Sequence, residues 1–183
     1  RILDPNTYGT VALITVLISI LQVFIDSGLG NALIQKSDAD HLDFSSVFFF
    51  NILMCTIIYI FLFISAPYIA RFYSNSELTP AIRVLGLTLI IAGLKNIQQA
   101  YVSRNLLFKK FFFSTLGGTI GASIVGISLA YLGYGIWALV GQLLFNNLVD
   151  TIILWITGDW KPRLEFSLSR LKKLLSFGWK LLV

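Results

Sequence analysis

The stretch FFFSTLGGTIGASIVGISLAYLGYGIWALVGQLLFNNLV, residues 111–149, decides the fold class because its 39 residues include no charged side chain. As one helix it would be about 58 Å long at 1.5 Å per residue, whereas the apolar core of a bilayer is about 30 Å thick. Leu132-Gly133-Tyr134-Gly135 is a turn signal in its middle. The stretch therefore predicts two membrane-spanning helices, at about residues 110–132 and 135–157.

Three further apolar runs precede this stretch and predict spans at about residues 8–34, 44–70 and 80–105. The whole chain of 183 residues is 56% hydrophobic and 13% charged, with a mean hydropathy of +0.81. Soluble domains are about 45–50% apolar and about 25% charged, so a soluble domain and a disordered chain are both excluded. Transmembrane strands are short and alternate in polarity, whereas these runs are far longer and do not alternate. The sequence predicts an all-α transmembrane helical bundle.

Proline positions suggest where some of these helices begin and end. Asp4-Pro5 and Thr79-Pro80 each place a capping residue before a proline, which is typical of a helix start. Pro67 is expected to mark the end of the second span, because proline breaks a helix interior.

Lysine and arginine are unequally divided between the two sets of loops, which predicts orientation because cytoplasmic loops are enriched in these residues. One set holds nine of them, against Arg1, Arg71 and Arg83 in the other. The first set comprises Lys36, Arg104, Lys109, Lys110, Lys161, Arg163, Arg170, Lys172 and Lys173. We therefore expect that set to face the cytoplasm.

The segment 158–176 differs from the spans because it is basic and amphipathic. Leu164, Leu168, Leu171 and Leu175 recur at helical spacing, with basic residues on other faces. This pattern favours a linker helix lying on the cytoplasmic surface; a plain connecting helix with snorkelling lysines is the alternative. Residues 177–183 resemble the start of another membrane helix. We expect the chain to be an internal piece of a longer protein.

Three charged residues fall inside predicted spans, at similar depth: Asp26, Lys95 and Asp150. Charges in a membrane usually face a bundle interior or an aqueous cavity. Each belongs to a polar stripe at helical spacing, so a shared cavity between helices is predicted; the alternative is a structural ion pair of Lys95 with one aspartate. The candidate cavity residues are Gln22, Asp26, Lys95, Gln98, Gln99, Gln142, Asn146, Asn147 and Asp150. The second span, with Asn51 and Cys55, is expected to face lipid.

Other features give no indication of catalysis. Small residues at Gly117 and Gly121 form a GxxxG pattern, which favours close and static helix contact. Asp38-Ala39-Asp40 has the form of a DxD metal motif, but a solvated loop is the expected structure, with His41 facing solvent. A single histidine, a single cysteine and no catalytic motif predict a protein that is not an enzyme and holds no metal or cofactor.

Several segments, in their order and spacing, carry a resemblance to a known family. They are RILDP at 1–5 with Tyr8-Gly9, DSGLGNALIQK at 26–36, APYIA at 66–70, GIWALV at 135–140 and FGWK at 177–180. Together they resemble the Wzx-type oligosaccharide flippases of the MOP (MATE-like) superfamily. The resemblance implies that residues 1–157 correspond to the second to sixth helices of an N-terminal six-helix bundle.

The resemblance also implies a function and its partners. Such proteins place two six-helix bundles around a cavity that opens alternately to each side. They move undecaprenyl-pyrophosphate-linked oligosaccharide across the bacterial inner membrane for lipopolysaccharide, O-antigen or exopolysaccharide synthesis. Expected partners are this lipid-linked oligosaccharide, membrane lipids and other polysaccharide assembly proteins, and not nucleic acid. Coupling to a proton or Na⁺ is open.

The residues suggest roles within that function. Lys95 would attract the pyrophosphate, the amide side chains would hydrogen-bond sugar hydroxyls, and Asp26 or Asp150 would hold Lys95 or take up a coupling ion. Three alternatives stay open. They are a multidrug or small-solute exporter of the same superfamily, a membrane polysaccharide polymerase or ligase, and a membrane scaffold without transport activity.

Overall fold

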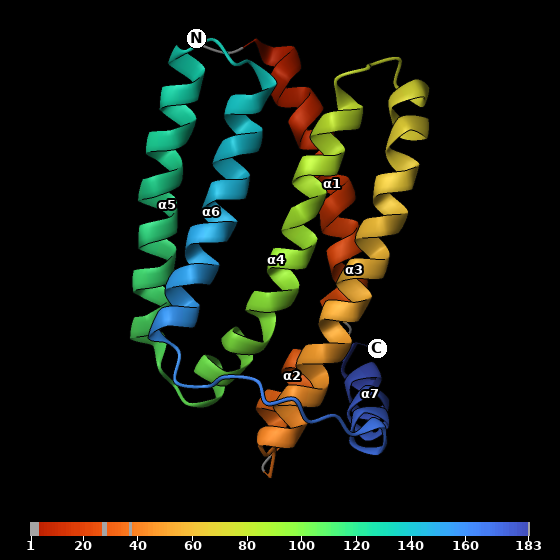
Figure 1. The fold of residues 1–183 in the computed structure, drawn as a ribbon, viewed down its shortest axis with the longest axis vertical. Coiled ribbons are helices and arrows are strands. Elements are labelled where there is room, and N and C mark those ends of the chain that lie inside the picture. Colours follow the sequence, from red (N-terminus) through yellow and green to blue (C-terminus); the bar gives the residue numbers. More distant parts are fainter. Residues whose placement is uncertain (1–3, 27–28, 37, 183) are drawn as a thin grey trace.

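The computed structural model describes residues 4–26, 29–36 and 38–182, without the side chains of Phe24, Asp26 and residues 177–182. Everything regular in the described part is helical (Figure 1). The helices in chain order are α1 (Pro5–Asp26), α2 (Leu29–Gln35), α3 (His41–Phe72), α4 (Leu78–Arg104), α5 (Phe108–Tyr131), α6 (Ile136–Thr157) and α7 (Leu168–Leu182).

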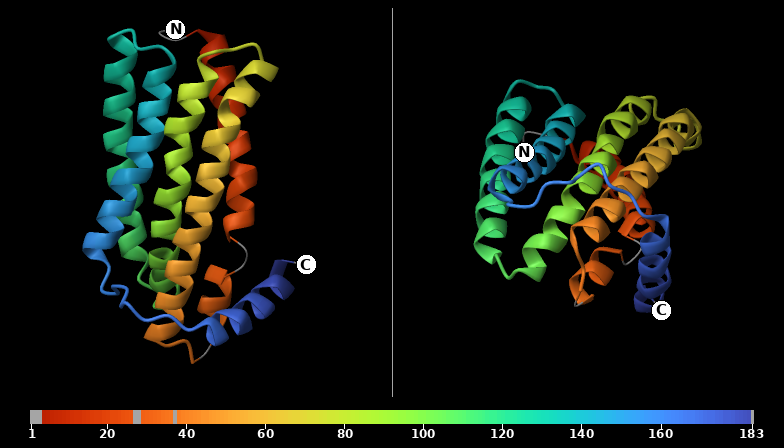
Figure 2. Two further views of the ribbon diagram at one scale, coloured as in Figure 1. Left: turned by 45° about the vertical axis from the view of Figure 1, so that its right-hand side comes forward. Right: turned by 60° about the horizontal axis from the view of Figure 1, so that its bottom comes forward.

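Five helices, α1, α3, α4, α5 and α6, run side by side as long rods, whereas α2 and α7 lie at one end (Figures 1 and 2). Each of the five is long and apolar enough to cross a membrane. Many of their outward side chains are apolar, such as Phe61 at 68% and Ile124 at 62% exposure. The predicted all-α transmembrane bundle is confirmed, and the boundaries of α5 and α6 fall within two residues of the predicted ones.

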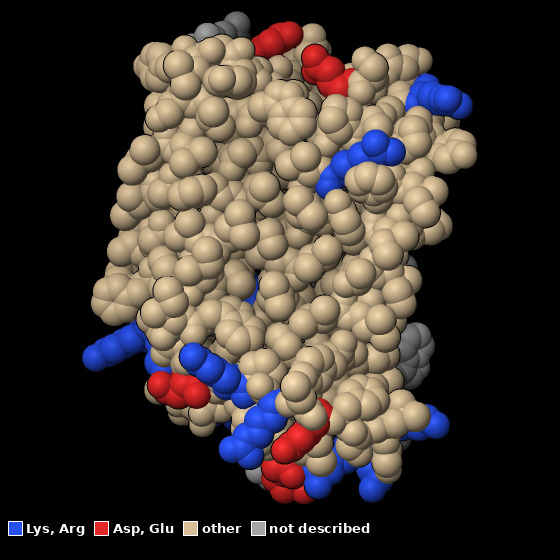
Figure 3. All heavy atoms as spheres, in the orientation of Figure 1, with Lys and Arg blue, Asp and Glu red and all other residues tan. Residues whose placement is uncertain are grey.

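Charged side chains gather at the two ends of the bundle, with a broad uncharged band between them (Figure 3). The α2–α3 and α4–α5 loops and residues 158–167 lie at one end, which we call the basic end. The α3–α4 and α5–α6 loops lie at the other. The structure thus separates the two sets of loops as the sequence predicts, and the cytoplasmic assignment of the basic end stays a prediction.

The first predicted span, 8–34, is divided into two helices. α1 ends at Asp26 and α2 begins at Leu29; residues 27 and 28 lie outside the described part of the chain. The sequence has glycine at 28 and 30, and glycine costs about 1 kcal/mol per residue in a helix relative to alanine. The apolar run from 8 to 34, which Asp26 interrupts, therefore forms two helices and not one.

Proline does not act as predicted in α3 and α4. α3 continues through Pro67 to Phe72, so the expected helix end at Pro67 is wrong. α4 begins at Leu78, before Thr79-Pro80, and its N-cap Glu77 makes no side-chain capping bond. Pro80 is tolerated in the first turn because N–H groups there have no partner within the helix in any case. The helix start at Pro5 is as predicted.

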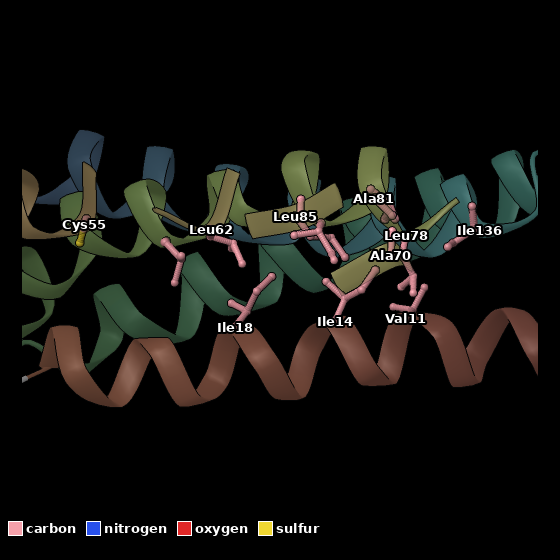
Figure 4. Packing of buried hydrophobic residues seen from close by; sticks show 14 of the residues in the cluster. Val11, Ile14, Ile18, Cys55, Leu62, Ala70, Leu78, Ala81, Leu85 and Ile136 are labelled. Atoms are coloured by element: carbon pink, nitrogen blue, oxygen red, sulfur yellow. The ribbon is translucent and has the colours of Figure 1, made fainter. Parts of the chain in front are cut away.

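The core consists of two apolar clusters stacked along the bundle. The first joins α1, α3, α4 and α6 through buried residues such as Ile14, Leu62 and Leu85 (Figure 4). The second lies toward the basic end and gathers Leu33, Phe48 and Trp160 with residues of α4 and α7. The two clusters fix the helices around α4, which contacts every other long helix.

Residues 158–167 cross the basic end as an extended strap between α6 and α7. Three hydrogen bonds to buried side chains hold the strap. Gln98 Nε2 donates to the Trp160 carbonyl at 2.8 Å. The Arg163 and Ser167 amides donate to Ser45 Oγ at 3.2 Å and Ser46 Oγ at 2.9 Å. Residues 158–167 were expected to belong to a helix; the strap replaces helical bonds with these contacts.

α7 is amphipathic, as the sequence predicts. Leu171 and Leu174 are buried on the side that packs against α2, whereas Lys172 and Lys173 are exposed. The helix runs without interruption through position 177 to Leu182. The division of the chain into a bundle, a linker and a further span stays a prediction.

Candidate polar site within the membrane-spanning helices

Lys95 of α4 and Asp150 of α6 form an ion pair between Lys95 Nζ and Asp150 Oδ2. Only 19% and 13% of the two side chains are exposed. Ser114 of α5 donates from Oγ to the Asp150 carbonyl at 3.0 Å, which ties a third helix to the same place. A charge in a membrane span needs such a partner, and Asp150 supplies one for Lys95; whether the pair is only structural or belongs to a cavity stays a prediction.

Glycines of α5 explain how α6 presents its polar residues. A Cβ on Gly118 would lie 2.8 Å from Asn146 Oδ1 and 3.2 Å from Asp150 Cβ. A Cβ on Gly126 would lie 2.8 Å from Gln142 Oε1. The polar stripe of α6 therefore packs against the small-residue face of α5. The predicted close contact of α5 is present, and its static character stays a prediction. Asn146 is at this helix seam, not in an open cavity.

The polar stripe of α1 meets other residues. Thr15, Ser19 and Gln22 line a small pocket of about 100 Å³ together with Thr88 of α4 and Asn147 of α6. Thr15 and Ser19 also line a wider, mainly apolar groove of about 630 Å³ between α1 and α6, which Gln142 borders. Gln22, Gln142 and Asn147 thus lie near the α1–α6 boundary, while the side chain of Asp26 lies outside the described residues.

The polar stripe of α4 is divided between two surroundings. Gln98 is fully buried, and its amide donates to the strap at the Trp160 carbonyl. This contact stabilises the strap and leaves Gln98 outside the cavity described next. Gln99 instead lines a cavity of about 420 Å³ near α2, α3 and the start of α5. The other polar residues that line this cavity are Asn31, Asn51, Asn96 and Ser103.

In the described structure the candidate residues thus lie in several places, and the single shared cavity stays a prediction. Helical spacing finds the polar face of each helix but not the neighbour that the face meets. Sequence reasoning missed Asn31 and Asn96 as cavity residues. Asn96 directly follows Lys95, and Asn31 lies five residues after Asp26 in the same predicted span, so both amides stood near charges that the sequence already marked.

Asn51 and Cys55 correct the expectation that this part of the second span faces lipid. Asn51 Nδ2 donates to the Gly93 carbonyl at 3.3 Å, and Cys55 is fully buried. A Cβ on Gly93 would lie 2.5 Å from Cys55 Sγ. The absence of a side chain at Gly93 lets α3 and α4 approach closely, so their shared face is interior.

The DxD-like loop has a structural role at the basic end. Asp40 caps α3 in a capping box with Asp43, and its carboxylate pairs with Arg170 of α7. Because the Arg170 guanidinium hydrogen-bonds to it, the pKa of Asp40 lies below its ordinary value. Lys36 Nζ lies 2.5 Å from Oδ2 of the buried Asp43. Among the described residues, no group of three His, Cys, Asp or Glu side chains could hold a metal ion.

His41 is only partly exposed, and one side of its ring is packed, in contrast to the solvent-facing position expected. Its ring centroid lies 5.7 Å from that of Trp160, and Nδ1 lies 3.3 Å from Ser45 Oγ. Phe44, Phe48 and Tyr101 surround the same tryptophan. His41 is therefore part of the packing that secures the strap.

The sequence profile of the family described as "Polysaccharide biosynthesis protein" matches residues 1–183. The chain is 28% identical over 180 residues to the succinoglycan biosynthesis transport protein ExoT of Rhizobium meliloti, covering 98% of this chain and 36% of that protein. It is 31% identical to the teichuronic acid biosynthesis protein TuaB of Bacillus subtilis over 165 residues, 86% of this chain and 33% of TuaB.

It is also 24% identical to the lipopolysaccharide biosynthesis protein WzxC of Escherichia coli over 181 residues, 97% of this chain and 37% of WzxC. The chain thus spans about a third of the length of these curated relatives. No solved structure matches it significantly.

Proposed function

The chain belongs to the polysaccharide biosynthesis protein family, and from that membership we propose that its full-length protein transports lipid-linked oligosaccharide across a membrane. The substrate class is undecaprenyl-pyrophosphate-linked oligosaccharide. The membrane is the bacterial inner membrane, and the purpose is synthesis of a surface polysaccharide such as lipopolysaccharide O-antigen or exopolysaccharide. Two relatives, a succinoglycan transport protein and a lipopolysaccharide biosynthesis protein, support this proposal.

The observation that carries the proposal is the Lys95–Asp150 ion pair between two membrane-spanning helices. A buried charge pair is weak evidence for added stability, because desolvation offsets much of the attraction. In membrane proteins such charges commonly mark the path of an ion or polar substrate. A pyrophosphate is an anion that would compete with Asp150 for the Lys95 ammonium, which gives the pair a role in an alternating cycle.

In this cycle Asp150 holds Lys95 while the site is empty. Substrate entry from the cytoplasmic side brings the pyrophosphate to Lys95, and its departure on the other side restores the ion pair. The protein side of the step is a change of partner at Lys95 Nζ. Coupling by a proton or Na⁺ would act on Asp150 or Asp26, because these are the carboxylates within the spans.

The test uses the full-length protein in a bacterium whose own flippase has been deleted. Wild type is expected to restore surface polysaccharide, and Lys95→Ala at equal membrane level is expected not to. Lys110→Ala is the matched control, because Lys110 pairs with the exposed Asp159 at the basic end, and it should export normally.

Two results would contradict the proposal. Normal export by Lys95→Ala would remove the role of Lys95. Failure of wild type to restore polysaccharide, combined with resistance to cationic drugs, would favour an exporter of the same superfamily.

A further inference from the structure

The cavity of about 420 Å³ between α2 and α4 lies toward the basic end and has a mixed polar and apolar lining. Five of its residues have uncharged polar side chains, and none of the described residues that line it is charged. The five are Asn31, Asn51, Asn96, Gln99 and Ser103. Polar side chains that face such a space need hydrogen-bond partners, because an unpaired polar group away from water is costly.

The nearest cations along the chain are committed elsewhere. Lys95 precedes Asn96, but its ammonium pairs with Asp150 of α6. Arg104 follows Ser103, and its guanidinium donates to the Leu33 carbonyl at 3.0 Å. The cavity therefore offers amide and hydroxyl groups without a formal charge among its lining residues.

Amide side chains both donate and accept hydrogen bonds, and a sugar hydroxyl does the same. The remaining lining is apolar and includes Ile25, Val47, Ile97 and Phe111, which suits the C–H faces of a pyranose ring. The volume lies within the range of about 300–1,000 Å³ typical of small-molecule sites. A few polar groups on an apolar wall is the usual composition of such a site.

We propose that this cavity binds a neutral sugar unit of the lipid-linked oligosaccharide, which rests on the function proposed above. The site is separate from the Lys95–Asp150 pair, which would meet the pyrophosphate. A uronic acid is disfavoured, because a carboxylate would lose its hydration with no lining cation to offset that loss. Gln99 is the principal hydrogen-bonding residue, because its helix, α4, also carries Asn96 and Ser103 into the same cavity.

The experiment uses the purified full-length protein in nanodiscs and two probes that differ in one group. The first is farnesyl-pyrophosphate-linked cellobiose; the second is the same molecule with its terminal glucose oxidised to glucuronic acid. Wild type is expected to bind the neutral probe about tenfold more tightly. Gln99→Leu is expected to weaken that binding by about five- to tenfold, the loss that one or two hydrogen bonds produce.

Gln35→Leu is the matched control, since Gln35 is exposed at the end of α2 and does not line this cavity; it should bind as wild type does. Thermal unfolding of each variant checks that the fold is retained, and Gln99→Asn, which keeps the amide, should recover part of the affinity. Equal affinity of wild type for both probes, or unchanged affinity of Gln99→Leu, would overturn the sugar site.

The two proposals fail in different ways. If wild type restores polysaccharide export while Gln99→Leu binds and exports equally, only the sugar site is wrong. If wild type binds neither probe and restores no export, the transport function itself is wrong.

Discussion

Arg83 of α4 donates from Nε to the backbone carbonyl of Phe63 in α3, at 3.4 Å. Phe63 lies four residues before Pro67, and proline has no N–H with which to bond that carbonyl. The Arg83 guanidinium carbon also lies 4.2 Å from the centroid of the Phe63 ring. An arginine of the neighbouring helix therefore supplies a hydrogen bond to the carbonyl that the proline leaves without its helical donor, within a helix that continues to Phe72.

Replacing Arg83 by leucine is expected to lower the free energy of unfolding by about 1 kcal/mol, the net contribution of one such hydrogen bond. Combined with Pro67→Ala, which restores the helical bond to Phe63, the same substitution should cost clearly less. Thermal or denaturant unfolding of the four proteins in the double-mutant cycle measures this coupling. Equal costs with and without Pro67 would show that Arg83 does not complete α3.

Replacing one member of the Lys95–Asp150 pair is expected to lower the free energy of unfolding strongly, whereas replacing both members is expected to lower it little. Lys95→Met alone leaves Asp150 uncompensated, and the loss of one partner from a buried pair costs about 3–5 kcal/mol. Lys95→Met together with Asp150→Leu should recover most of that stability and should still fail to export polysaccharide. Unfolding in detergent and an export assay separate the two effects. A double variant that exports normally would reduce the pair to a structural role.

Gly93→Ala is expected to destabilise the bundle by about 1–3 kcal/mol through overpacking, because the new methyl would lie 2.5 Å from Cys55 Sγ. Adding Cys55→Ala removes the sulfur and should recover most of the loss. Gly9→Ala is the control, since a Cβ there meets nothing within 4 Å, and it should gain up to about 1 kcal/mol of helix propensity. A Gly93→Ala protein as stable as wild type would contradict the close α3–α4 contact.

The Asp40–Arg170 pair predicts that α7 loosens in acid. The pKa of Asp40 is lowered in the folded protein, chiefly by the hydrogen bond from Arg170, so the unfolded chain binds more protons in that range. The stabilising contribution is therefore complete above the ordinary carboxyl pKa of about 3.9 and is lost as the pH falls through the lowered value. The effect is small, because the two side chains are 49% and 41% exposed and solvent screens them.

Hydrogen exchange of α7 at pH 6 and at lower pH measures this change. Asp40→Asn keeps a good N-cap residue but removes the charge, so its exchange should already be faster at neutral pH and should depend less on acid. Exchange in the wild type that is independent of pH in this range, after correction for the intrinsic rate, would contradict the pair's contribution.

Most of the spans could be predicted because each rests chiefly on one property, the length of a mainly apolar run. The turn at 132–135 was equally readable, since Gly133 and Gly135 adopt φ values of 80° and 53°, which favour glycine. The pairing of Lys95 with an aspartate followed from the cost of an isolated charge in a membrane. Such inferences need only the chain itself and the bilayer.

The surroundings of each polar residue could not be predicted in the same way. Gln98 and Gln99 are neighbours in sequence, yet one is buried against the strap and the other lines a cavity. The strap contributes backbone carbonyl and amide groups from an irregular segment, and no sequence pattern predicts the course of that segment. Asn146 meets α5 only because Gly118 lacks a side chain, so its position depends on a residue of another helix.

The seam between α5 and α6 also constrains how the protein is made. Asn146 and Asp150 are polar side chains of α6 that would be costly to expose to lipid. The glycine face of α5 packs against them. Lys95 is synthesised 55 residues before Asp150, so α4 emerges before the aspartate with which it pairs in the folded protein. Release of α4, α5 and α6 into the bilayer as one co-translational unit avoids exposing either charge to lipid.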